Sequence, residues 1–188
     1  MWWRTCSARK FAPSIIWKRC GRRISATKPP PRRWTIKAVS IAIVAVGRLK
    51  SGSERTLIDT YIKRIPWPIA EIEIEERRPL TGRERTAREG DLLLQAIPEG
   101  ALVVALDSAG RTLTSNAFAK KLEAWRASGR VLAFVIGGAE GLSPPVLARA
   151  DETLSLSAMT WPHALARVLL AEQLYRAHAI LSGHPYHK

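Results

Sequence analysis

The chain has 188 residues, of which 46% are hydrophobic, so it can bury one ordinary core and carry a tail but is short for two domains. Its formal net charge of +14 is concentrated near the start: residues 1–37 hold 11 Lys or Arg and no Asp or Glu, which leaves 19 basic and 16 acidic residues beyond them. A nearly neutral body suits an enzyme that makes a few phosphate contacts better than a protein that coats nucleic acid through bulk charge.

The sequence predicts neither a metal site nor a membrane segment. The only cysteines, Cys6 and Cys20, have no histidine near them, so they support no zinc site and no disulfide framework. The longest apolar run, residues 38–46, is far shorter than the roughly 20 residues that a membrane-spanning helix needs. We therefore expect a soluble, cytoplasmic protein without a metal or a membrane partner.

Residues 1–37 are predicted to be a basic, disordered extension ahead of a domain that spans residues 38–188. They mix tryptophans with arginines and end in a proline-rich stretch, as a flexible linker does. Three other interpretations stay open: an organelle transit peptide, an arm that touches RNA, or a misassigned start. In the last case translation would begin at Val39 with a non-standard codon, because no methionine occurs between Met1 and Met159.

From residue 38 onward, short β-branched runs alternate with amphipathic segments, which is typical of an α/β domain with a largely parallel sheet. The predicted strands cover residues 39–46, 69–75, 101–106, 131–136 and 153–157, and the predicted helices cover residues 53–64, 86–96, 115–128, 144–150 and 163–181. The second strand alternates apolar and acidic residues, so we expect it nearer an edge than the others.

Three segments that leave predicted strands should meet at the carboxyl edge of the sheet, where open α/β sheets bind ligands. They are Leu106-Asp107, Gly137-Gly138 and residues 157–161. The two glycines allow positive φ and a close approach of the backbone to a flat adenine or a sulfonium ligand, although a tight turn alone would also explain them. Neither GxGxxG after the first strand nor GxxxxGK[ST] occurs, which argues against a dinucleotide enzyme and an NTPase.

The loop over residues 157–163 places Met159 and Trp161 where polar turn residues are usual. It indicates an apolar ligand face, a subunit interface or a cap on the core. The last residues, 184–188, offer hydrogen-bond donors, a stacking ring and positive charge, which suit an unstacked base and its phosphates, although chain ends are usually disordered.

Several motifs in order resemble one family. They are Val44-Ala45-Val46-Gly47, Ile136-Gly137-Gly138 with Glu140-Gly141-Leu142, Leu154-Ser155-Leu156-Ser157 continuing through Met159-Thr160 and Pro162-His163, Arg167-Val168 with Glu172-Gln173-Leu174-Tyr175-Arg176-Ala177, and Tyr186-His187-Lys188. From residue 39 to the end the chain is similar to the ribosomal RNA large subunit methyltransferase H family of the SPOUT class. The resemblance implies a C-terminal trefoil knot, a homodimer, and S-adenosylmethionine-dependent methylation of N3 of a pseudouridine in 23S ribosomal RNA, in a stem-loop near the decoding centre of the ribosome. The cofactor contacts that it implies are Leu106, Gly137, Leu156, Ser157, Ala158, Met159, Thr160 and Trp161.

Methyl transfer requires a donor and a nucleophile held close together, and the removal of one proton from the base. The candidate catalytic residues are His163, Arg167, Tyr186 and His187; the histidine or tyrosine of the tail is expected nearest the base, and the arginine is expected to act through its charge. Three alternatives stay open: a SPOUT enzyme that acts on transfer RNA, a nucleotide-binding hydrolase, and a catalytically silent RNA-binding module.

Overall fold

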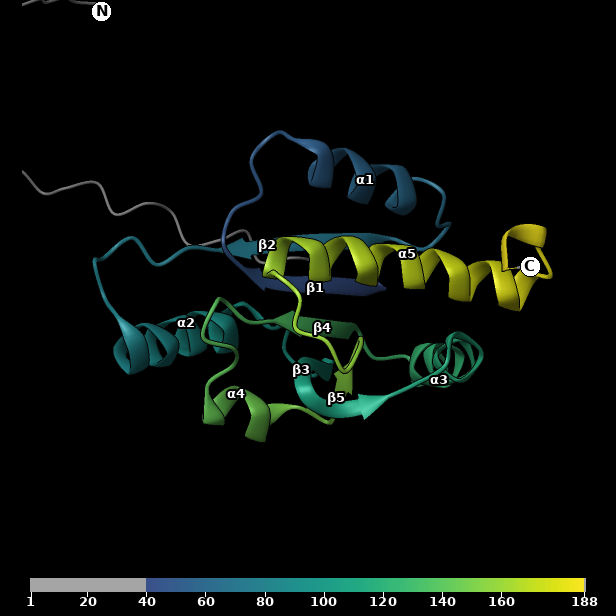
Figure 1. Ribbon diagram of the computed structural model, residues 1–188. Helices are drawn as coiled ribbons and strands as arrows, with labels where there is room; N and C mark the ends of the chain where they lie inside the picture. The colour runs from purple at the N-terminus through teal and green to yellow at the C-terminus, as the bar shows by residue number, and fades with distance from the viewer. Residues whose placement is uncertain (1–39, 188) are drawn as a thin grey trace, which may run out of the picture. The chain divides into compact units, whose positions relative to one another are not determined.

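Five parallel strands form one sheet in the part of the chain that the computed structural model describes, residues 40–187, with His187 described only through its backbone. The predictions for residues 1–37 lie outside this range. The strands are β1 (Ile41–Val46), β2 (Ile69–Ile74), β3 (Leu102–Thr112), β4 (Leu132–Ile136) and β5 (Glu152–Ser155), in the order β2-β1-β4-β3-β5 (Figure 1). The predicted α/β class with a parallel sheet is confirmed, and so is the edge position of the second strand.

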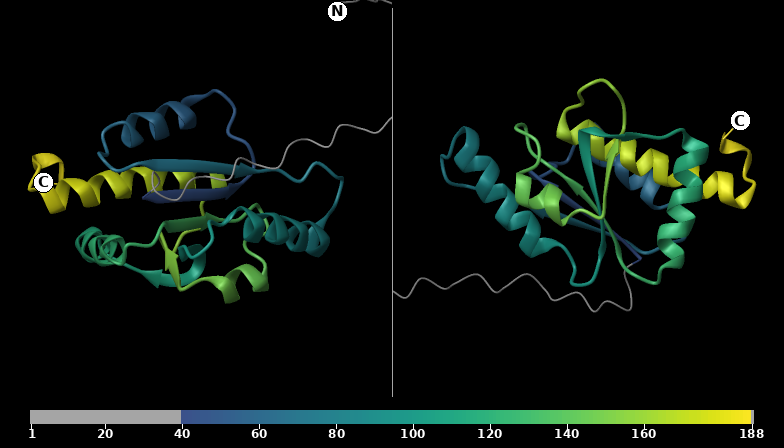
Figure 2. Two further views of the ribbon diagram at one scale, coloured as in Figure 1. Left: turned by 180° about the vertical axis from the view of Figure 1, so that it is seen from behind. Right: turned by 90° about the horizontal axis from the view of Figure 1, so that it is seen from below.

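Helices cover both faces of the sheet (Figure 2). They are α1 (Ser53–Ile62), α2 (Gly82–Ala96), α3 (Ser115–Ala127), α4 (Pro144–Arg149) and α5 (His163–Ser182). Alternate residues of β1 face opposite ways: Ile41 and Ile43 join the core under α1, α3 and α5, whereas Ala42 and Val44 join the core under α2 and α4. Both faces of the central strands are therefore buried, which explains their uninterrupted apolar runs.

Two elements are longer than the sequence predicts. β3 continues past Leu106 to Thr112, and its pairing with β5 is interrupted between Leu106 and Arg111. Gly110 permits this close pairing, because a Cβ there would lie 2.7 Å from the backbone of Leu154. Helix α2 begins at Gly82, four residues before the predicted start. The prediction starts too late because the first turn of the helix carries charged residues without apolar periodicity.

The chain ends in an ordered turn where a frayed end is usual. Gly183, with φ of 70°, ends α5 in the left-handed conformation, and the short 3-10 helix η2 (Pro185–His187) follows. The expected trefoil knot stays a prediction. Within residues 40–187 no helix is long and apolar enough to cross a membrane.

Candidate functional site

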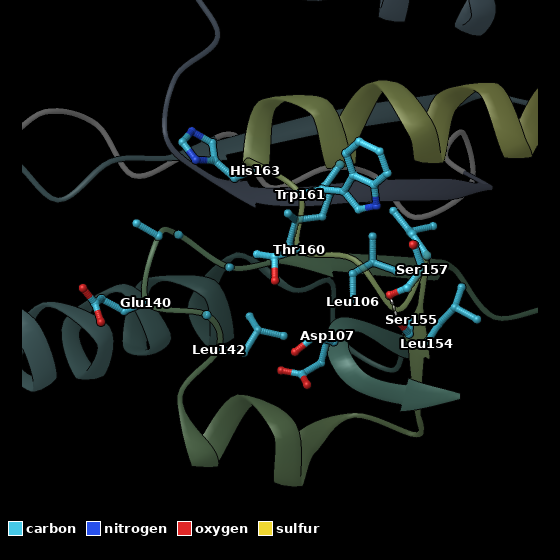
Figure 3. A pocket seen from close by; sticks show the side chains of 18 of the residues that line it. Leu106, Asp107, Glu140, Leu142, Leu154, Ser155, Ser157, Thr160, Trp161 and His163 are labelled. Carbon is cyan, nitrogen blue, oxygen red and sulfur yellow. Dashed lines mark hydrogen bonds between the residues drawn. The ribbon is translucent and has the colours of Figure 1, made fainter. Parts of the chain in front are cut away.

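A cavity of about 390 Å³ opens at the carboxyl ends of β4 and β5 and beside residues 106–108 in the middle of β3, where the pairing of β3 with β5 is interrupted (Figure 3). Its walls come from the three segments that the sequence predicts to meet there, together with the start of α5. The lining residues are Leu106, Asp107, Ser108, Ile136, Gly137, Gly138, Ala139, Glu140, Gly141, Leu142, Leu154, Ser155, Leu156, Ser157, Met159, Thr160, Trp161, His163 and Ala166. Seven of the eight predicted cofactor contacts are among them; the eighth, Ala158, lies within the same loop but outside this lining.

The loop after β4 folds back on itself at the cavity wall. Gly138 and Gly141 form an antiparallel bridge, and a Cβ on Gly137 would lie 2.5 Å from the carbonyl oxygen of Gly141. The expected reason for the glycine pair needs correction, because positive φ belongs to Gly141 (82°) and not to Gly137 or Gly138. Gly137 is required because two backbone segments approach each other closely there.

The loop after β5 is held by short-range hydrogen bonds. The Ser155 hydroxyl donates to the Ser157 carbonyl at 2.7 Å, and the Met159 amide donates to the Ser157 hydroxyl at 3.0 Å. The side chain of Met159 is 68% exposed and that of Trp161 is 39% exposed. Because both stand open to solvent at the cavity, the interpretation that they cap the core is wrong, and the ligand face and the subunit interface remain as interpretations.

His163 begins α5 at the rim of the cavity. Its side chain is exposed, but one ring edge lies against the first strand's exit loop, since a Cβ on Gly47 would lie 3.1 Å from its Nε2. Partial burial, and secondarily the positive charge of Arg167, lower the pKa of His163 below its usual 6.5. The imidazole is therefore neutral at neutral pH and can accept a proton.

Arg167 lies one turn into α5 and is 2% exposed. Its Nη1 donates to the Glu73 carboxylate at 3.0 Å, while Nη2 donates to the carbonyl oxygens of Val46 and Gly47, each at 2.5 Å. The same carboxylate accepts the backbone N–H of Leu49 at 2.9 Å. Both terminal nitrogens of Arg167 are thus committed to oxygens of the chain, so this guanidinium fastens α5 to the ends of β1 and β2.

Tyr186 lies at the opposite end of α5 from the cavity. Its ring contacts Tyr175, with centroids 4.6 Å apart, and its hydroxyl donates to Glu172 at 3.3 Å. Burial, a hydrogen bond with Tyr61 and the charge of Glu172 raise the pKa of Tyr186 to about 12. Glu172 and Tyr175 lie 9 and 12 residues after His163, so at 1.5 Å per residue this cluster lies about 14 to 18 Å along the helix from His163. Within one chain, therefore, the structure brings His163 and Arg167 together and keeps Tyr186 apart; the side chain of His187 lies outside the described residues.

Sequence reasoning did not single out three polar groups of the cavity wall, Ser108, Glu140 and Ser155. Ser108 and Glu140 lie two and four residues after predicted strands and Ser155 lies within one, so closeness to a strand end was the available signal. Among residues 40–187, no three His, Cys, Asp or Glu side chains are grouped so that they could hold a metal ion.

Comparison with known proteins gives consistent matches over the domain. A family model described as "Predicted SPOUT methyltransferase" matches residues 39–187. Ribosomal RNA large subunit methyltransferase H of Paramagnetospirillum magneticum is 53% identical over 149 residues, which make up 79% of this chain and 98% of that protein. The protein of the same name from Rhodospirillum rubrum is 51% identical over 151 residues, 80% of this chain and 99% of the relative.

Among solved structures, a probable methyltransferase from Bordetella pertussis superimposes with a TM-score of 0.51 at 17% identity. The match covers 74% of this chain and 96% of that one. At this identity the likeness concerns the fold.

Proposed function

The chain belongs to the SPOUT methyltransferases, within the ribosomal RNA large subunit methyltransferase H family, and from this premise we propose that it methylates N3 of a pseudouridine in 23S ribosomal RNA. The observation that carries the proposal is the cavity at the carboxyl edge of the sheet, two of whose walls, within residues 136–142 and 154–163, carry motifs of the family. The proposed target is the stem-loop near the decoding centre, in the assembled ribosome, and a cytoplasmic location follows from this substrate.

The cavity suits S-adenosylmethionine as the methyl donor. Its volume lies within the range of small-molecule sites. Leu106, Leu156 and Met159 offer apolar surface for an adenine ring, and the loop of Gly137 brings backbone to the same cavity wall. When bound, this cofactor supplies a methyl group on a positively charged sulfur. We assign its contacts to Leu106, Gly137 and residues 156–161.

The chain's own task is then to hold the base and to manage the N3 proton. Neutral His163, at the cavity rim, is placed to accept a proton. Tyr186 stays protonated at neutral pH, because its pKa is about 12, so it would donate a hydrogen bond to the base rather than remove its proton. Arg167 holds His163 near Gly47 and supplies local positive charge.

A homodimer resolves the separation between the tail and the cavity. Because Tyr186 is held against Glu172 and Tyr175, about 14 to 18 Å along α5 from His163, we infer that Tyr186 and His187 reach a bound base from a second copy. Exposed apolar side chains near the start of α5, namely Trp161 and Leu165, together with Leu57 on α1, offer surface for such a contact. We propose that the tail of each subunit completes the site of the other.

We propose residues 38–188 as the complete methyltransferase and residues 1–37 as a dispensable extension. A chain that begins at Ala38 should dimerise and methylate ribosomes like the full chain, with at most a modest rise in the salt sensitivity of binding. If the shortened protein binds the cofactor but no longer methylates ribosomes, residues 1–37 are a recognition element.

Mass spectrometry of RNA from a deletion strain, with and without the gene restored, tests the proposed function. Loss of one methylpseudouridine from 23S ribosomal RNA is the expected result, whereas loss of a transfer RNA methylation would assign the enzyme to that substrate. Calorimetry should detect binding of S-adenosylmethionine and none of nucleoside triphosphates. Methyl transfer by the purified protein would exclude a silent RNA-binding module.

A further inference from the structure

Five arginines stand together on the segment that joins β2 to the first half of α2. This arginine cluster comprises Arg77, Arg78, Arg83, Arg85 and Arg88, and the first four are exposed along with two-fifths of the Arg88 side chain. Neither the cavity nor the tail uses them. No aromatic residue occurs between residues 75 and 91, so the segment offers cations without a stacking surface.

The carboxylates that pair with the cluster lie beneath it. Glu76 has a side chain only 7% exposed, and it accepts hydrogen bonds from Arg78 Nη2 at 2.9 Å and from Arg88 Nε at 3.2 Å. Glu89, at 10% exposure, pairs with Arg85 at 3.2 Å. For Arg78, Arg85 and Arg88 the surface therefore presents the outer edges of guanidinium groups that are held by carboxylates, while Arg77, paired with the exposed Glu75, and Arg83 add exposed positive charge.

Residues 75–91 hold five arginines and five carboxylates, so their formal charge is zero, but Glu76 and Glu89 lie beneath the arginines and the exposed carboxylates are Glu75, Glu84 and Asp91. Arg48 and Lys50 add two further exposed cations on the loop after β1, where residues 47–53 contain no acidic residue. Because β1 and β2 are parallel neighbours, both loops leave the sheet at its carboxyl edge, on the same edge as the cavity.

The cluster adjoins the cavity wall through its buried partner. A Cβ on Gly138 would lie 2.7 Å from Glu89 Oε2. Glu140 lies on the same wall (Figure 3), close enough for its charge to act on Glu89. On the other side, Gly47 contacts His163 and leads directly to Arg48. A base seated at the cavity would therefore have these cations beside its neighbouring nucleotides.

We propose that the arginine cluster, together with Arg48 and Lys50, binds backbone phosphates of the RNA strand that flanks the target nucleotide. The inference rests on the proposed function and adds to it the path of the substrate. Oriented guanidiniums match the fork geometry of phosphate oxygens and lose little freedom on binding. Without aromatic neighbours they fix the register of the strand and leave the choice of base to the cavity.

The test compares two double variants that each remove two positive charges. Arg77→Gln with Arg83→Gln alters the cluster without touching Glu76 or Glu89. Lys63→Gln with Lys120→Gln is the matched control, because both lysines are exposed and lie away from the β1 and β2 exit loops. Lys63 follows α1, and Lys120 lies on α3. The cluster variant should raise KM for ribosomal RNA substrate about tenfold and lower the slope of log Kd against log salt by about 1 to 2.

Affinity for S-adenosylmethionine, kcat and the unfolding midpoint should stay unchanged in both variants. Arg77→Lys with Arg83→Lys should restore the salt slope, because phosphate also accepts a point charge. Equal RNA affinity and equal salt slope in the cluster and control variants would overturn the inference. If the unaltered protein methylates no ribosomal RNA, the proposed function fails instead, and direct RNA binding by the same variants separates the two failures.

Discussion

The two ends of α5 are fixed in different ways. At its start, Arg167 is buried and bonds to backbone carbonyls and to Glu73, beside the cavity. After its end the chain turns back, and Tyr186 is held by a ring contact with Tyr175 and by a hydrogen bond to Glu172. The first end is thus held by the polar bonds of a buried side chain, and the second by a ring contact and one hydrogen bond. Substitutions at the first end should affect the ligand, whereas changes at the other end should affect assembly and substrate.

The largest expected effect is at the cavity end, with Gly137→Val. The new side chain would collide with the backbone of Gly141 and displace the loop over residues 138–142, so binding of S-adenosylmethionine should become undetectable by calorimetry. Most of the sheet is remote from this loop, and circular dichroism should show a folded protein. Gly52→Val is the matched control, since its position is exposed and extended. Near-normal affinity in a folded Gly137→Val protein would remove this glycine from the site.

Deletion of residues 184–188 probes the opposite end. Methyl transfer should fall at least a hundredfold, because the proposed base contacts are lost, while affinity for S-adenosylmethionine should stay within a few fold. Loss of the Tyr186 ring contact should cost about 1 kcal/mol of unfolding free energy. Assays of transfer, cofactor binding and oligomer size on one protein distinguish the possibilities. A shift to monomer indicates an interface role for the tail, and undiminished transfer contradicts both roles.

Arg167→Ala and Tyr186→Phe compare single polar contacts at the two ends. The first variant leaves the carboxylate of Glu73 and two carbonyls without their donor, and it should lower the free energy of unfolding by about 3 kcal/mol. The second removes one hydrogen bond at a partly exposed site, which should cost about 0.5 kcal/mol. Denaturant titration measures both, and equal losses would abolish the proposed contrast between the ends.

The smallest expected effect concerns protonation of His163. Its pKa is lower in the folded chain than in the unfolded one, so the unfolded chain binds the proton first as the pH falls. The stability that neutral His163 contributes is present above about pH 6.5 and is lost as the pH drops through that value toward the folded pKa. Because the ring is exposed, the change should be a few tenths of a kcal/mol. His163→Gln should flatten this part of the stability profile; His178, whose pKa is also lowered, remains in both proteins as an internal reference.

The sequence predicted the parts of the fold that depend on local pattern. β4 and the core of β3 are continuous apolar runs, and burial on both faces of a parallel sheet requires that pattern. The start of α2 was not predicted because charged residues occupy its first turn. The extension of β3 was not predicted because a glycine such as Gly110 usually indicates a turn, whereas here it allows β5 to pack closely against β3.

For the site, the ends of the predicted strands were enough to predict that the cavity walls meet, because parallel strands place their carboxyl ends at one edge of a sheet. The burial of Arg167 could not be predicted. An arginine in an amphipathic helix has the same local pattern whether it faces solvent or, as here, the ends of β1 and β2, and Glu73 lies 94 positions away in the chain. The packing of Tyr186 back against Glu172 and Tyr175 could not be predicted either, because the turn after Gly183 brings it there.

The strand order β2-β1-β4-β3-β5 has a consequence for how the chain is made on the ribosome. The first two strands can pair as soon as Ile74 has emerged, but β1 keeps one open edge until β4 is synthesised some 60 residues later. The last wall of the cavity arrives with His163, close to the end of the chain. A nascent chain therefore carries β1, an apolar strand, with one edge open until β4 is made. Its ligand site takes shape later still, when the start of α5 is made.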